Sequence, residues 1–175
     1  MMDLRYPIGT FAWEGTAAAE KRKDWIRDIE KLPSLLSAAV HGLSDDQLDL
    51  PYREGGWSIR QVVHHLADSH MNSYIRFKLA LTEDNPTIKP YDEQKWAMMQ
   101  DSTIVNVKVS LSLIESLHAR WAAVLNAMDP TDFARTFYHP ESQKTMSLDY
   151  ATGMYAWHGK HHTAHITSLR ERLAI

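Results

Sequence analysis

Residues 58–77, which read SIRQVVHHLADSHMNSYIRF, decide the fold class of this protein. Ser58 followed by Gln61 forms a capping box, a pair of side chains that satisfies free backbone amides at a helix start. Apolar residues then recur at steps of three and four, which is the period of a helix with one buried face. These residues are Ile59, Val62, Val63, Leu66 and Phe77. The stretch predicts a long amphipathic helix that reaches Glu83, before the Asn85-Pro86 pair stops it.

Three further stretches carry the same helical period. The first covers about residues 16–43, and Pro33 inside it is expected to kink this helix or split it in two. The other two cover about residues 111–128 and 148–173. Together with the helix that opens at Ser58, they predict four helices of comparable length.

The connections between these helices differ in length. Residues 85–109 are expected to be mostly loop, with a short helix around Trp96. The stretch 136–146 predicts a short β-hairpin just before the last helix. Four helices with one long crossover and shorter joins predict an all-α protein, an antiparallel four-helix bundle. With 175 residues, the chain is expected to form one domain over residues 1–175.

Composition excludes several classes of function. A formal net charge of −3 gives no reason to expect nucleic acid or an anionic membrane as a partner. The absence of cysteine excludes disulfides, thiolate metal sites and a cysteine nucleophile. The N-terminal residues lack the pattern of a signal peptide, and no apolar run reaches membrane-spanning length. A cytoplasmic protein without a membrane partner is therefore expected.

The ten histidines are the main chemical signal, since four of them lie between positions 158 and 165. His158 and His162 are one turn apart on the apolar face of the last predicted helix, and such a pair can offer two imidazole nitrogens to one metal ion. His161 and His165 have the same spacing, but His161 is expected to turn outward. Imidazoles buried without a common purpose would leave ring nitrogens unsatisfied, at about 1–3 kcal/mol each. The cluster therefore favours a metal site over ordinary core or surface histidines.

A third ligand is expected from the helix that opens at Ser58. His70 lies within its apolar stripe and suits the core, whereas His64 points well away from the stripe. His65 lies at the edge, at the head of a polar row, and is the better ligand. A polar row beside a core stripe is typical of a wet pocket between helices, although the row could instead simply face solvent. The row continues with Ser69, Asn72 and Arg76.

Four motifs extend this pattern along the chain: YPIG at 6–9, PYREGGWS at 51–58, RQVVHHLADSH at 60–70 and WHGKHHTAH at 157–165. With these motifs in this order and spacing, nearly the whole chain resembles the YfiT branch of the DinB-like metalloenzymes. The resemblance implies an antiparallel four-helix bundle, often dimeric, so a homodimer is expected. It also implies one zinc or nickel ion per chain, whose ligands in this sequence are His65, His158 and His162.

Three neutral histidines would leave a divalent ion with an open coordination position. Such an ion lowers the pKa of bound water toward about 7, and the family label is that of a metal-dependent hydrolase acting on a small molecule. The same ion could ionise a substrate thiol. The alternative is therefore an S-transferase that joins a low-molecular-weight, bacillithiol-like thiol to an electrophile. A third alternative is a metal-binding helical protein without catalysis.

No residue is an unambiguous general base, so the catalytic residues stay unassigned with three candidates. Asp68 is one turn from His65 and could orient a ligand ring or take a proton, or be an ordinary solvated residue. Asn72 and Arg76 could bind an anionic substrate group or merely pair with surface carboxylates. The metal is expected to face a pocket that includes Ser69, Asn72 and Arg76.

Overall fold

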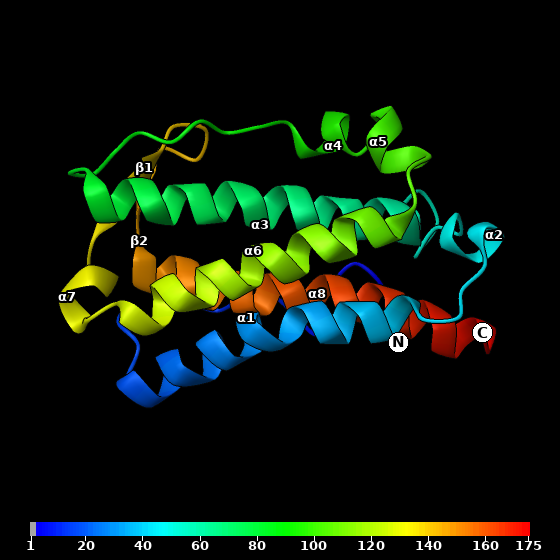
Figure 1. Cartoon of the computed structure of the whole chain (residues 1–175), viewed down its shortest axis with the longest axis horizontal. Helices are drawn as coiled ribbons and strands as arrows, with labels where there is room; N and C mark the ends of the chain where they lie inside the picture. The colour runs from blue at the N-terminus through cyan, green and yellow to red at the C-terminus, as the bar shows by residue number, and fades with distance from the viewer. Residues whose placement is uncertain (1–2) are drawn as a thin grey trace.

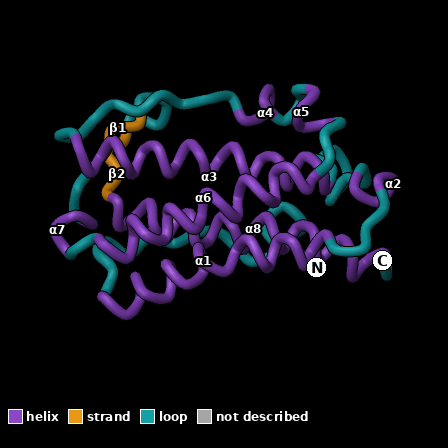
Figure 2. The backbone as a smooth tube through the Cα atoms, viewed as in Figure 1, coloured by secondary structure: helices purple, strands orange, loops and turns teal. Residues whose placement is uncertain are grey.

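The computed structural model describes residues 3–175. Four long helices make up most of it (Figure 1): α1 (Ala19–Val40), α3 (Ile59–Thr82), α6 (Val107–Ala127) and α8 (Leu148–Leu173). Short helices lie in the connections (Figure 2): α2 (Asp45–Leu48), α4 (Glu93–Trp96), α5 (Gln100–Thr103) and α7 (Pro130–Phe133). Strands β1 (Thr136–His139) and β2 (Lys144–Ser147) pair as an antiparallel hairpin before α8. The predicted four-helix bundle and its hairpin are confirmed.

The long crossover allows some neighbouring helices of the bundle to run parallel. In Figure 1, α1 and α8 run one way and α3 and α6 run the other way. The contacting pairs α1·α6 and α3·α8 are therefore antiparallel, as expected, whereas α1·α8 and α3·α6 are parallel. Parallel neighbours require a connection that returns along the bundle. The segment between α3 and α6 does this, and it carries α4 and α5 (Figure 2).

The local signals in the sequence set most helix ends. The predicted capping box is present, because the Ser58 hydroxyl accepts from the Gln61 amide and the Gln61 side chain accepts from the Ser58 amide. Helix α6 begins one turn earlier than expected, with Asn106 as its N-cap. Pro33 does not split α1, which continues through it from residue 19 to residue 40. The apolar residues on either side of Pro33, Leu32 and Leu36, are both buried and hold this helix against the core.

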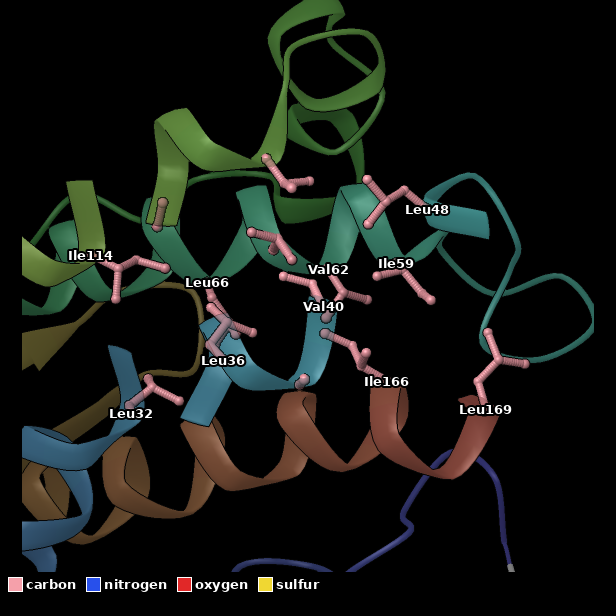
Figure 3. Packing of buried hydrophobic residues seen from close by; sticks show 14 residues of the cluster. Leu32, Leu36, Val40, Leu48, Ile59, Val62, Leu66, Ile114, Ile166 and Leu169 are labelled. Atoms are coloured by element: carbon pink, nitrogen blue, oxygen red, sulfur yellow. The ribbon is translucent and has the colours of Figure 1, made fainter. Parts of the chain in front are cut away.

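The core consists of two apolar clusters at opposite ends of the bundle. One joins the second half of α1 to the first half of α3 and the last turns of α8, as Figure 3 shows for Leu36, Val62 and Ile166. The other surrounds Phe77 and Trp121. Between these clusters along the helices lies a group of buried and partly buried histidines, which we call the histidine layer. Its members are the buried His65, His70, His118, His161, His162 and His165 and the partly buried His158.

Helices α1 and α8 approach closely at Gly159, because glycine has no side chain to separate α8 from Leu32. A Cβ atom placed on Gly159 would lie 2.7 Å from Leu32 Cδ2. A side chain at this position would force the buried Leu32 side chain or the helices to shift. Gly159 lies between His158 and His162 in the sequence, so this contact also fixes the depth at which α8 presents its histidines.

Within residues 3–175, no helix is long and apolar enough to cross a membrane.

Candidate metal centre

The structure brings three histidine side chains together from two helices. His65 comes from α3, and His158 and His162 come from successive turns of α8. One ring nitrogen of each lies within 4.8 Å of the other two, and the Nε2 atoms of His65 and His158 are 3.3 Å apart. This is the trio that the sequence singles out. Three nitrogens at such separations fit one divalent ion, because zinc–nitrogen bonds of about 2.0–2.1 Å place neighbouring ligand atoms a little over 3 Å apart.

Burial keeps these three rings neutral. Desolvation, and next the nearby His161, lower the pKa of His65 to about 4. Burial and neighbouring imidazoles also hold the pKa values of His158 and His162 well below the ordinary value. A neutral imidazole has a free lone pair, which is the form that binds metal. The three neutral imidazoles of the trio are therefore suited to bind a divalent cation.

An open cavity of about 690 Å³ leads to the trio. One part of its wall is aromatic: Trp57 lies with its ring centroid 4.7 Å from that of His65, and Trp157 stacks on His161 at 4.4 Å. Charged residues of the connections complete the lining, namely Arg5, Arg53 and Glu93. Sequence reasoning missed these three residues because they lie outside the long helices, where no periodicity indicates which way a side chain points.

Beyond His65, the polar row on α3 does not line this cavity, which corrects the expected pocket. Ser69 is buried instead, and Tyr91 of the long crossover lies within hydrogen-bonding reach of it. The Asn72 amide donates to the Asp68 carbonyl oxygen of its own helix. Arg76 lies near His139 of β1. The crossover and the hairpin lie over this part of α3 (Figure 1), so the cavity opens toward the first turn of α3 instead.

The structure adds burial to one expected histidine orientation and corrects another. His64, which is expected to point away from the apolar stripe, is buried, with Nδ1 2.7 Å from the Ser110 hydroxyl and Nε2 3.0 Å from the Val105 carbonyl oxygen. His161 is not turned outward, since it is buried and lines the cavity. Both differences arise because flanking segments cover helix faces that the periodicity of one helix leaves exposed.

The core position of His70 is confirmed, and its partner is a residue that sequence reasoning did not single out. His70 is fully buried, and its Nδ1 lies 2.9 Å from Nε2 of His118 on α6. His118 shares the buried stripe of its helix with Ile114 and Trp121. A histidine at a stripe position was the signal available, because a buried imidazole needs a polar partner.

A second group of three histidines shares one member with the first. Ring nitrogens of His161, His162 and His165 lie within 4.8 Å of one another. His165 is already engaged on both sides, with Nδ1 3.3 Å from His162 Nδ1 and Nε2 3.1 Å from the Arg5 carbonyl oxygen. The Arg5 carbonyl oxygen can only accept, so it leaves His165 only Nδ1 for a metal, whereas no ring nitrogen of the first trio has such a contact among the described residues.

Asp68 gives a prediction about stability. Burial, and next the negative charge of Asp101, raise the pKa of Asp68 to about 6. The folded state therefore binds more protons than the unfolded state between about pH 4 and pH 6, and stability falls as the pH rises through this window. We expect Asp68→Asn to raise the free energy of unfolding by about 1 kcal/mol at pH 7, after allowance for partial exposure, and by nothing below pH 4.

Urea denaturation at both pH values measures this difference. The exposed Asp84→Asn serves as control and should change little at either pH. An Asp68→Asn protein that is less stable than the original at pH 7 would contradict the prediction and point to an ionised carboxylate with a structural role.

A four-helix bundle with three inward-facing histidines at the base of an open cavity defines a class of helical proteins suited to hold a metal ion. This chain belongs to the DinB superfamily, whose family model matches residues 28–166. The match covers all of the candidate metal ligands.

Individual relatives agree with this family. A Bacillus mycoides protein named "putative metal-dependent hydrolase" is 60% identical over 173 residues, covering 99% of each chain. A Bacillus cereus protein (strain ATCC 10987) of the same name is 58% identical over the same length and coverage. Among solved structures, YfiT from Bacillus subtilis is 49% identical with a TM-score of 0.96, and 98% of each chain is covered. It is described as "a probable metal-dependent hydrolase with an unusual four-helix bundle topology".

Proposed function

We propose that this protein is a metal-dependent hydrolase of small molecules, with His65, His158 and His162 as the ligands of one zinc or nickel ion. The observation that carries the proposal is the convergence of three neutral imidazole nitrogens at the base of an open cavity. The names of the close relatives support the same class. A divalent ion with three histidine ligands would lower the pKa of a coordinated water toward about 7 and polarise a substrate carbonyl or phosphoryl group.

Glu93 is our candidate for the general base. It is the one carboxylate among the described residues that line the cavity. Partial burial, followed by the negative charges of Glu141 and Asp92, raises its pKa. A raised pKa makes a carboxylate a stronger base near neutral pH, so Glu93 suits the removal of a proton from water. We keep Asp68 as a weaker candidate for the base, and Asn72 and Arg76 as weaker candidates for binding an anionic substrate group, because all three lie outside the lining.

The cavity favours a substrate with a negative group and an apolar body. Arg5 and Arg53 carry positive charge at its wall, and positive charge around a cavity attracts anions. Trp57 and Trp157 supply aromatic surface beside the candidate ligands. The metal held by the three histidines would orient the reacting group of the substrate. Arg5 and Arg53 would bind its anionic end at the cavity wall.

Metal-dependent hydrolysis by the purified protein tests the proposal. Metal-free protein is reloaded with zinc, nickel, cobalt or manganese and assayed against anionic esters, amides and phosphoesters. Glu93→Gln should lower kcat by about 10²-fold or more at unchanged metal content, whereas Glu115→Gln, in the separate groove between α1 and α6, should leave it unchanged. Hydrolysis that does not depend on added metal would overturn the proposal.

Cobalt-substituted protein and a thiol-conjugation assay distinguish the hydrolase from its two alternatives, which are a metal-binding protein without catalysis and a thiol S-transferase. Small thiols or hydroxamates should change its visible d–d spectrum if a coordination position is open. A spectrum that stays constant up to millimolar ligand favours a purely structural ion, which normally has four protein ligands. Conjugation of an added thiol to an electrophile, without hydrolysis, would favour the S-transferase.

The proposal also includes a homodimer in the cytoplasm with about one ion per chain. Elemental analysis of protein purified without a polyhistidine tag measures the metal content, and light scattering measures the oligomeric state. Protein that contains no metal and cannot be reloaded would overturn the metal assignment.

A further inference from the structure

Five rings of the histidine layer form two chains of hydrogen bonds, and each chain ends on a backbone carbonyl. The longer chain starts at the Ile29 carbonyl oxygen on α1, 2.6 Å from His118 Nδ1. His118 Nε2 is 2.9 Å from His70 Nδ1, and His70 Nε2 is 3.1 Å from His158 Nδ1. The shorter chain starts at the Arg5 carbonyl oxygen, 3.1 Å from His165 Nε2, and passes from His165 Nδ1 to His162 Nδ1 over 3.3 Å.

The carbonyl of Ile29 fixes the proton positions along the longer chain. A carbonyl oxygen only accepts, so His118 Nδ1 must carry a proton and donate it. A neutral His118 then has a lone pair on Nε2, which accepts from His70 Nδ1. A neutral His70 in turn accepts on Nε2 from His158 Nδ1. The proton of His158 is thereby placed on Nδ1, and its Nε2 lone pair is left facing His65 Nε2.

The same reasoning holds for the shorter chain. His165 Nε2 donates to the Arg5 carbonyl, so a neutral His165 accepts on Nδ1. Its partner is His162 Nδ1, which must therefore carry the proton. Nε2 is the nitrogen of His162 that remains free to bind a metal. Both α8 members of the trio thus reach the same state through different neighbours.

Burial keeps the three outer members of the chains, His70, His118 and His165, neutral and largely separated from water. His70 is 0% exposed, His118 is 1% exposed and His165 is 3% exposed. Burial lowers the pKa of His118 to about 4, while its bond to Ile29 opposes this shift. Water therefore does not compete for these hydrogen bonds, and a buried ring in the wrong tautomer would leave a donor or an acceptor without a partner.

We propose that His70, His118 and His165 are positioning residues that hold His158 and His162 in the Nδ1–H tautomer, with both Nε2 lone pairs directed to the metal position before an ion arrives. An isolated neutral imidazole exchanges between two tautomers, and only one of them offers a given nitrogen. Outer partners of this kind usually end on a carboxylate, a carbonyl or water. Here intervening imidazoles carry the orientation from carbonyls in two other segments of the chain. The inference rests on the metal ligands of the proposed function but not on hydrolysis.

The tautomers can be read directly by NMR. Two-bond ¹⁵N–¹H correlation spectra of the metal-free protein distinguish rings protonated at Nδ1 from rings protonated at Nε2. We expect Nδ1–H for His70, His118, His158 and His162, and Nε2–H for His165. A metal-free spectrum with His158 or His162 protonated at Nε2 overturns the proposal, whatever the protein catalyses.

Matched variants test whether the chains act on the metal site. His70→Leu removes the acceptor for His158, whereas His70→Gln keeps an oxygen near the position of Nε2. His165→Leu and His165→Asn form the corresponding pair for His162, since an asparagine oxygen lies near the position of Nδ1. Each leucine variant should lower zinc affinity by about 10–100-fold, and each amide variant should recover most of that loss.

A control variant and the zinc stoichiometry complete the test. His64→Leu is the control, because His64 is buried on α3, the helix that carries His70, but lies outside both chains. It should leave zinc affinity and the tautomers of His158 and His162 unchanged. If His70→Leu fails to fold, the His165 pair and the spectrum of the unaltered protein still decide. Equal affinities for leucine and amide variants would overturn the positioning role. Two zinc ions per chain would overturn the shorter chain, because His162 Nδ1 would then bind metal instead of donating.

Discussion

Replacing His65, His158 or His162 by alanine should lower zinc affinity by roughly 10²–10³-fold in each case. Protein zinc sites with four ligands reach binding free energies of about 10–16 kcal/mol, or about 2.5–4 kcal/mol per ligand. The loss should be at the upper end here, since a trio has no ligand to spare. Competition with a chromophoric chelator measures the affinity, and circular dichroism checks that each variant is folded.

His64→Ala is the matched control for these substitutions. It should retain zinc affinity, because both ring nitrogens of His64 face Ser110 and Val105 and not the trio. It should nonetheless lower the free energy of unfolding by about 1–3 kcal/mol, because buried partners lose their hydrogen bonds. The ligand assignment fails if His161 and His165 prove essential for binding while His158 and His162 are dispensable.

Asp149→Ala should lower the free energy of unfolding by about 3–5 kcal/mol, the usual cost of breaking one side of a buried ion pair. Asp149 lies in the first turn of α8 and is 2% exposed. Its carboxylate accepts from Arg22 Nε at 2.7 Å, from Arg22 Nη2 at 3.0 Å and from the Ala17 amide at 2.9 Å. The substitution leaves a guanidinium and a backbone amide without partners at the start of both α1 and α8. Total stabilities of about 5–15 kcal/mol make this a large fraction.

Urea denaturation followed by tryptophan fluorescence measures this loss. Asp28→Ala is the control, because the Asp28–Lys160 pair joins the same two helices but is partly exposed. It should cost no more than about 1 kcal/mol. Arg22→Ala combined with Asp149→Ala should cost less than the sum of the single substitutions, since the two residues share one interaction. Equal losses for Asp149→Ala and Asp28→Ala would contradict the prediction.

The histidine layer gives the bundle a functional section between two structural ones. The apolar clusters on either side supply most of the buried apolar surface. Most rings of the layer hydrogen-bond to one another or to a backbone carbonyl, whereas the buried Nδ1 of His161 has no partner among the described residues. Because the apolar clusters hold the helices in register, the candidate ligands of α3 and α8 are positioned by rigid elements and not by loops.

The sequence by itself determined the four helices and the hairpin. Their signals are local: the capping box at Ser58, the apolar period of each helix and the turn residues between the two strands. It also indicated the trio His65, His158 and His162, because spacing on one helix face predicts which side chains point inward. Those signals depend only on neighbours in the chain, so they can be interpreted without a structure.

Tertiary structure alone decided what surrounds the trio. It paired His70 with His118, buried His64 and His161, and placed Arg5, Arg53 and Glu93 in the cavity wall. Each of these depends on which segment covers which helix face, and the crossover that runs back along α3 sets much of it (Figure 1). Periodicity gives the inward direction of one helix but not the identity of the partner it meets. A buried imidazole finds its hydrogen bond on another helix, and only the packed bundle brings the two together.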